Sequence, residues 1–258
     1  MPNWCINQLE INGPKGALDS FRKHAEHQVT ETNPEPSVLS FQATVPMPES
    51  LRVSIRGSCS LIGYDAFHGD YKTVMAYSWI PEGVKSVAEL QAYLDTMSPE
   101  YRIQGDLAKA NMDAYGYPDW LAWAGDKWGT KWDAQETSVY DEGTKLTYTF
   151  DTAWSPPVPW ATTVSKQFPE LHFKLAFEEP GMDFTGWVSV QNGEVLDDME
   201  EACWIAIPPD DMDCDDMKYD DFDESDFYSM GYVHDPDKTG LLLEDWEASQ
   251  SLKSTKIN

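Results

Sequence analysis

One stretch, 145 KLTYTFDTAWSPPVPWATTVSKQFPELHFKLAF 177, decides the fold. Its first part, Lys145–Thr152, alternates apolar and polar residues, which is typical of a strand with one buried face. The chain then passes Trp154-Ser-Pro-Pro157 into Val158–Phe168, which we predict to be a helix. Leu171–Phe177 alternates again and predicts a second strand. The stretch is therefore a strand–helix–strand unit.

The N-terminal part of the chain repeats this order. Trp4–Ile11 alternates and ends at the turn Asn12-Gly13-Pro14, and a helical spacing of apolar residues follows at Leu18, Phe21 and Ala25. We predict the next strand at Val38–Val45. Two strand–helix–strand halves around an insertion indicate an α+β, ferredoxin-like split βαβ sheet with mixed or antiparallel strands.

The remaining boundaries follow from breaks in the pattern. Phe184–Gln191 is predicted as the last core strand, and Asn192-Gly193 is a hairpin signal that leads into Glu194. We therefore expect a core at 1–193, a mainly helical insertion at about 51–135, and an acidic C-terminal extension at 194–258.

The insertion is expected to form its own helical layer, because about ninety residues are too many for a plain loop. Its pattern predicts a strand at Leu51–Ile55, and either a strand or a buried helix at Tyr71–Ile80. An amphipathic helix is expected after the N-cap Ser86, with Val84, Val87, Leu90 and Leu94 as its apolar residues. Another is expected to begin near Pro99, with Ile103, Leu107 and Ala110 on one face.

Charge is distributed very unevenly along the chain. The formal net charge is −27, and 194–247 alone contains twenty Asp and Glu against two Lys, which accounts for −18 of it. Such a surface repels nucleic acids and anionic membranes, so neither is expected as a direct partner. The sequence has no apolar run long enough for a membrane span and no signal-peptide pattern, so we expect a cytoplasmic location.

Several separate blocks resemble one known family. Met1-Pro-Asn-Trp-Cys-Ile-Asn7, Val45-Pro-Met-Pro-Glu49, Trp128-Gly-Thr-Lys-Trp-Asp-Ala134 and Phe150-Asp-Thr-Ala-Trp-Ser-Pro-Pro157 are similar to the YubB-type ferredoxin-like domain family carried by plasmids and phages. The resemblance covers roughly residues 1–192. It implies the fold and an origin on a mobile element, and it supplies no catalytic residues.

The tryptophan-rich blocks contain the candidate ligand-binding residues. Lys131, Asp133 and Asp151 lie near aromatic residues and can form a polar site over an aromatic floor. Alternatively, the indoles pack under a sheet and the Lys–Asp pair ties two segments together, which is the more common role of such tryptophans.

Catalytic and cofactor motifs are missing from the sequence. There is no Walker loop, no G-x-G-x-x-G, no G-x-S-x-G and no H-E-x-x-H, so we expect no cofactor. The five histidines form no ligand pattern, and the four cysteines no CxxC pair. Two weaker alternatives remain: a divalent metal at Asp215, Asp216, Asp220 and Asp221, and a calcium loop from Asp235 in which the twelfth position is Trp246 instead of Glu.

The extension interleaves its acids with bulky apolar residues, which a purely solvating tail does not need. Two interpretations stay open, a solvated tail and a partner-binding surface. In the second, carboxylates supply fast association with a basic host protein and aromatic side chains anchor it. The expected function is that of a non-catalytic accessory protein, for example an anti-defence inhibitor or DNA mimic. The candidate partner-binding residues are Asp210, Asp211, Asp213, Asp215, Asp216, Asp220, Asp221, Phe222, Asp223, Glu224, Asp226 and Phe227.

Overall fold

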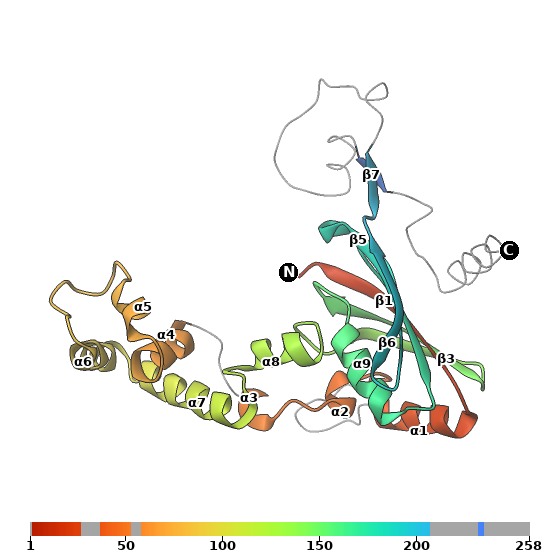
Figure 1. Ribbon diagram of the computed structural model, residues 1–258, viewed down its shortest axis with the longest axis horizontal. Helices are drawn as coiled ribbons and strands as arrows, with labels where there is room; N and C mark the ends of the chain where they lie inside the picture. The colour runs from red at the N-terminus through yellow and green to blue at the C-terminus, as the bar shows by residue number, and fades with distance from the viewer. Residues whose placement is uncertain (1, 27–36, 53–57, 207–231, 235–258) are drawn as a thin grey trace. The chain divides into compact units, whose positions relative to one another are not determined.

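In the computed structural model, residues 2–26, 37–52, 58–206 and 232–234 are described (Figure 1). They fall into two compact units. The sheet unit comprises Met1–Val45 and Trp128–Asn258, and the helical unit comprises Pro46–Lys127.

The sheet unit is built on a six-stranded sheet in the order β2-β3-β1-β4-β5-β6, and every neighbouring pair is antiparallel. A separate two-stranded sheet pairs β7 with β8. The strands are β1 (Trp4–Asn12), β2 (Gln135–Asp141), β3 (Lys145–Ala153), β4 (His172–Glu179), β5 (Phe184–Gln191), β6 (Glu194–Glu201), β7 (Trp204–Ala206) and β8 (Tyr232–His234). The helices of this unit are α1 (Lys15–Ala25), α2 (Phe41–Thr44), α9 (Val158–Gln167) and the short 3₁₀ helix η1 (Pro180–Met182).

The order β1-α1-β2-β3-α9-β4 is the β-α-β-β-α-β pattern of a ferredoxin-like fold, so the predicted α+β class is confirmed. The strands expected from the opening stretch, from Trp4–Ile11 and from Phe184–Gln191 are all present, as is the hairpin at Asn192-Gly193. Both hairpin residues have positive φ, 49° and 81°, as the turn requires. After that hairpin the chain adds β6 as a further strand of the sheet.

The predicted strand at Val38–Val45 is wrong. This segment contains the short helix α2, and the second strand of the ferredoxin-like pattern is β2, which lies beyond the insertion. The Asp133 carboxylate accepts hydrogen bonds from the backbone N–H groups of Phe41 and Gln42, and the Ser40 side chain accepts one from the N–H of Ala43. These acceptors satisfy the N–H groups that the first turn of a helix leaves unpaired.

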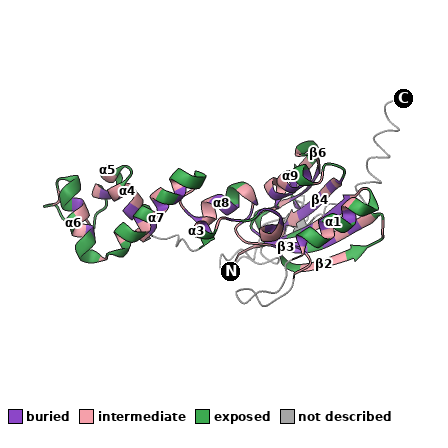
Figure 2. Cartoon of the chain, turned by 90° about the horizontal axis from the view of Figure 1, so that it is seen from below, coloured by how far each residue is buried: buried purple, intermediate pink, exposed green. Residues whose placement is uncertain are grey.

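The main core lies between one face of the sheet and the helices α1, α2 and α9, whose buried sides face the strands (Figure 2). Phe21 of α1 makes edge-to-face contacts with Tyr148 on β3 and Phe173 on β4. Phe41 of α2 contacts Phe150 on β3 and Trp160 of α9. We call this side of the sheet the helix-covered face. Because the core uses large aromatic residues, a few contacts fix the positions of all three helices.

The helical unit contains α3 (Glu49–Arg52), α4 (Ser58–Phe67), α5 (Tyr71–Met75), α6 (Val87–Met97), α7 (Glu100–Tyr115) and α8 (Trp120–Lys127). Its core is formed by Ala66, Val74, Leu90 and Leu94. The predicted helix after Ser86 is confirmed, with a full capping box to Glu89. Helices α4 and α7 meet at Gly63 and Gly105, where the backbones approach too closely for a side chain. Among the described helices, none has the length and apolar character that a membrane span needs.

Two expectations for the insertion are wrong. Leu51, expected in a strand, belongs to helix α3, and 53–57 lie outside the described residues. Helix α7 forms as expected, but Ile103 is 54% exposed and Ala110 is exposed as well. The buried positions are Gly105, Ala108 and Asn111. Gly105 is buried where α4 approaches, whereas the Asn111 side chain accepts a hydrogen bond from Ser50 Oγ and donates one to the Pro118 carbonyl oxygen. Of the two alternatives for Tyr71–Ile80, the helix is found, over Tyr71–Met75.

Candidate interaction surface

The three candidate ligand-binding residues do not form one site. Asp133 uses both carboxylate oxygens to cap α2, and Ser40 Oγ also donates to it at 2.8 Å. Burial raises the pKa of this carboxyl, although the hydrogen bonds to it act in the opposite direction. With both oxygens occupied in this way, Asp133 has a structural role, but its partners are Ser40 and the backbone of α2, and no contact with Lys131 is found among the described residues.

Lys131 and Asp151 lie on or beside the face of the sheet opposite the helices. The Lys131 ammonium lies 4.7 Å from the centre of the Trp132 ring, which in turn lies 6.1 Å from the ring of Trp4. Asp151 on β3 is opposite Ile6 on β1. The pKa of its carboxyl is raised mainly by burial and, to a smaller extent, by the negative charge of Glu136. Aromatic rings therefore accompany the lysine as expected, but no contact joins Lys131 to Asp151 among those described.

The remaining tryptophans of these blocks hold the sheet unit together. The Trp128 indole N–H donates to the Val45 carbonyl oxygen at 2.9 Å, and the Trp160 indole N–H donates to Thr44 Oγ1 at 2.7 Å. Gly129 has a φ of 82°, and a side chain there would lie 2.4 Å from Pro159. These residues fix the junction between Val45 and Trp128, through which the chain leaves and re-enters the sheet unit.

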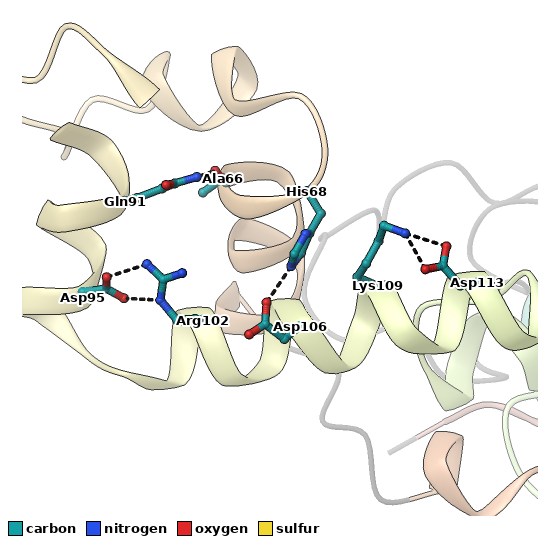
Figure 3. Close-up of polar contacts among 8 residues, drawn as sticks. All are labelled: Ala66, His68, Gln91, Asp95, Arg102, Asp106, Lys109 and Asp113. Carbon is teal, nitrogen blue, oxygen red and sulfur yellow. Dashed lines mark hydrogen bonds and ion pairs between the residues drawn. The ribbon is translucent and has the colours of Figure 1, made fainter. Parts of the chain in front are cut away.

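Two of the described histidines, His68 and His172, lie within hydrogen-bonding distance of polar side chains in different parts of the fold. In the helical unit, His68 Nε2 lies 2.6 Å from an oxygen of Asp106 on helix α7 (Figure 3). The same helix takes part in two ion pairs: Arg102 pairs with Asp95 of α6, and Lys109 pairs with Asp113 of α7 itself. In the sheet unit, His172 Nε2 lies 2.7 Å from Ser189 Oγ, and burial together with Lys174 lowers its pKa. Within the described residues, no group of three or more metal-ligating side chains is arranged to hold a metal ion.

A buried polar cluster lies where β4 ends. Glu179 is 2% exposed; its Oε1 accepts a hydrogen bond from the Gly181 N–H, while its Oε2 has no hydrogen-bond partner among the described residues. Burial raises the pKa of this carboxyl. Cys203, which follows β6, is fully buried beside it, and burial raises the pKa of that thiol to about 12. Cys203, within the acidic extension, is thus packed into the sheet unit.

The candidate partner-binding residues at 210–227 and the candidate calcium loop from Asp235 lie outside the described residues. The described part of the extension begins with β6, an edge strand of the six-stranded sheet that is rich in acids, and also includes Cys203, β7 and β8. Asp197, Asp198 and Glu200 are exposed on it. Sequence reasoning counted these acids but did not select them, although the hairpin at Asn192-Gly193 already predicted that a strand follows.

The chain is similar to proteins of one ferredoxin-like group. Residues 127–233 match the family described as "Ferredoxin-like domain in Api92-like protein". The crystal structure of the protein api92 from Yersinia pseudotuberculosis aligns with 78% of this chain and 99% of that chain, at 14% sequence identity and a TM-score of 0.41. No curated protein matches the chain. The family match, together with the strand and helix order, shows that the chain carries a ferredoxin-like domain, which is the fold that the resemblance implied.

Proposed function

We propose that this protein is a non-catalytic accessory protein that binds a basic surface of a host protein through its acidic extension. One observation carries the proposal: −18 of the net charge of −27 is concentrated in 194–247. The described start of the extension supports it, because the acids of β6 are held on an edge strand of the sheet. Charges held on a folded scaffold lose less entropy on binding than charges on a free tail.

The charge pattern also favours a particular kind of partner. A dense row of carboxylates attracts proteins whose surfaces are basic, and nucleic-acid-binding proteins are the commonest of these. We therefore propose that the protein competes with nucleic acid for such a surface in the host cytoplasm, as a DNA mimic or anti-defence inhibitor would. The blocks that resemble the YubB-type family support an origin on a phage or plasmid.

Pull-down from host lysate tests the proposal. The wild-type chain is compared with a variant in which the ten acids between Asp210 and Asp226 are changed to Asn or Gln, at low and at moderate salt. We expect partners that the wild type retains and the variant loses, and we expect duplex DNA to displace them. A variant with Phe222→Ala and Phe227→Ala, which keeps every charge, separates aromatic anchoring from charge. If no partner depends on the acids, the proposal is wrong.

The alternative function, a divalent-metal-dependent enzyme or calcium-binding protein, is distinguished by a different measurement. Thermal unfolding is followed with and without millimolar magnesium or calcium. A rise in melting temperature that disappears on changing Asp215, Asp216, Asp220 and Asp221 to Asn, or Asp235 and Asp237 to Asn, would favour this alternative.

A further inference from the structure

Within the described part of the chain, no strand pairs with the outer edge of β6. Strand β6 is the last strand in the sheet order. Its inner side pairs with β5 from Glu194 opposite Gln191 to Glu201 opposite Thr185. An edge strand of this kind presents a row of backbone N–H and C=O groups to which another extended chain can add.

Carboxylates line this edge on both sides of the sheet. The register places Asp197 opposite Ser189 and Glu201 opposite Thr185, on the face away from the helices. Asp198 lies opposite Val188 and Glu200 opposite Gly186, on the helix-covered face. A strand that added to β6 would therefore have carboxylates beside its side chains on both faces.

The sheet holds β6 in place before any partner arrives. Gly186 on β5 lets the backbone of β6 approach closely, because a side chain there would lie 2.3 Å from the Met199 carbonyl oxygen. On the face away from the helices, Met199 packs against Trp187 and Ala176. An edge that is already ordered costs little conformational entropy on binding.

From these observations we infer that β6 recognises an extended, lysine- or arginine-rich segment of a partner protein, which adds to the sheet as a seventh strand. This inference rests on the proposed function and specifies the class of partner. The same carboxylates reject an acidic strand or a second copy of β6, because like charges on directly neighbouring strands repel. The edge is thus selective for basic segments and protected from pairing with itself.

The test uses a synthetic seven-residue peptide of alternating lysine and threonine and the full-length chain. Two isomers of the peptide carry N-methyl groups on alternate backbone nitrogens, in the two opposite phases, and both keep every charge. Only one phase removes the N–H groups that face β6. We expect the isomer that lacks these N–H groups to bind at least ten-fold more weakly than the unmodified peptide. The other isomer should bind as tightly as the unmodified peptide. Binding is measured by calorimetry, and amide exchange should show new protection on β6.

Charge variants complete the design. Changing Asp197→Asn, Asp198→Asn and Glu200→Gln together should weaken peptide binding at least ten-fold. The control variant removes three exposed acids elsewhere, by Glu82→Gln, Glu136→Gln and Glu170→Gln. Its affinity for the peptide should differ from that of the wild type by less than two-fold.

The outcomes distinguish the inference from the proposed function. If both methylated isomers bind as tightly as the unmodified peptide, strand addition is wrong, and the proposed function is still judged by its own pull-down. If the peptide does not bind at all, the inference is again overturned. If the pull-down finds no partner that depends on the acids but the peptide still binds as expected, the proposed function is wrong. In that case β6 still accepts a basic strand, but the rest of the acidic extension does not bind a partner.

Discussion

Glu179 is a single residue at which burial and ionisation conflict. Its carboxyl is almost completely buried, one of its oxygens has no partner among the described residues, and burial raises its pKa. A raised pKa means that the folded chain favours the protonated, neutral form. The ionisation penalty is therefore absent below the usual Glu pKa of about 4.3 and grows as the pH rises through and above it.

We predict that Glu179→Gln stabilises the protein at pH 7 by about 1 kcal/mol, because it removes a buried charge one oxygen of which has no hydrogen-bond partner among the described residues. At pH 3 the difference should vanish, since Glu179 is then protonated in both states. Urea unfolding at the two pH values measures this, with the exposed Glu170→Gln as control. Destabilisation at pH 7 that vanishes at pH 3 would mean that the carboxylate has a favourable partner, and the interpretation of Glu179 would be wrong.

Close contact between two helices depends on glycine in the helical unit. An added Cβ at Gly63 would lie 1.9 Å from the Tyr101 carbonyl oxygen, and one at Gly105 would lie 2.5 Å from the backbone of Gly63. Backbone atoms cannot move aside as the end of a flexible side chain can, so α4 and α7 would have to separate. Overpacking of this kind typically costs about 1–3 kcal/mol.

We therefore predict that Gly63→Ala destabilises the helical unit by about that amount and speeds amide exchange in α4 and α7. Gly125 in α8 provides the matched control, because an added Cβ there meets no atom within 4 Å. Gly125→Ala should stabilise the unit by up to about 1 kcal/mol, since alanine favours helix more than glycine does. If Gly63→Ala and Gly125→Ala change the stability of the helical unit equally, the close approach of α4 and α7 is not the reason for a glycine at position 63.

The helices and strands also show what a sequence can predict. Strands β1, β3, β4 and β5 were predictable because alternation of polar and apolar residues reports directly on a half-buried strand. Helix α2 was not, because its start depends on Asp133, a residue about ninety positions away. The apolar residues of α7 were found, but their exposure depends on which helix packs against α7, and two glycines decide that. Lys131, Asp133 and Asp151 could be chosen by chemistry, whereas their separation could only be seen in the fold.

For the molecule as a whole, the chain path makes the helical unit a removable insertion. Every strand of the six-stranded sheet, together with α1 and α9, lies outside Pro46–Lys127. The two ends of the junction are adjacent within the sheet unit, where the Trp128 indole donates to the Val45 carbonyl oxygen. A short linker can therefore replace the insertion without stretching either end, and loop closure of this length costs little.

We predict that joining Val45 to Trp128 through four Gly and Ser residues gives a chain that unfolds cooperatively and keeps the near-ultraviolet signal of its buried tryptophans. Because β6 and the acidic extension remain, this chain should also bind the lysine–threonine peptide within about three-fold of the full chain. Linkers of two and six residues serve as controls for strain at the junction. If no linker length gives cooperative unfolding, the sheet unit needs the helical unit to fold, and the two are not independent. If the shortened chain folds but does not bind the peptide, recognition requires the helical unit, and assigning it to β6 alone is wrong.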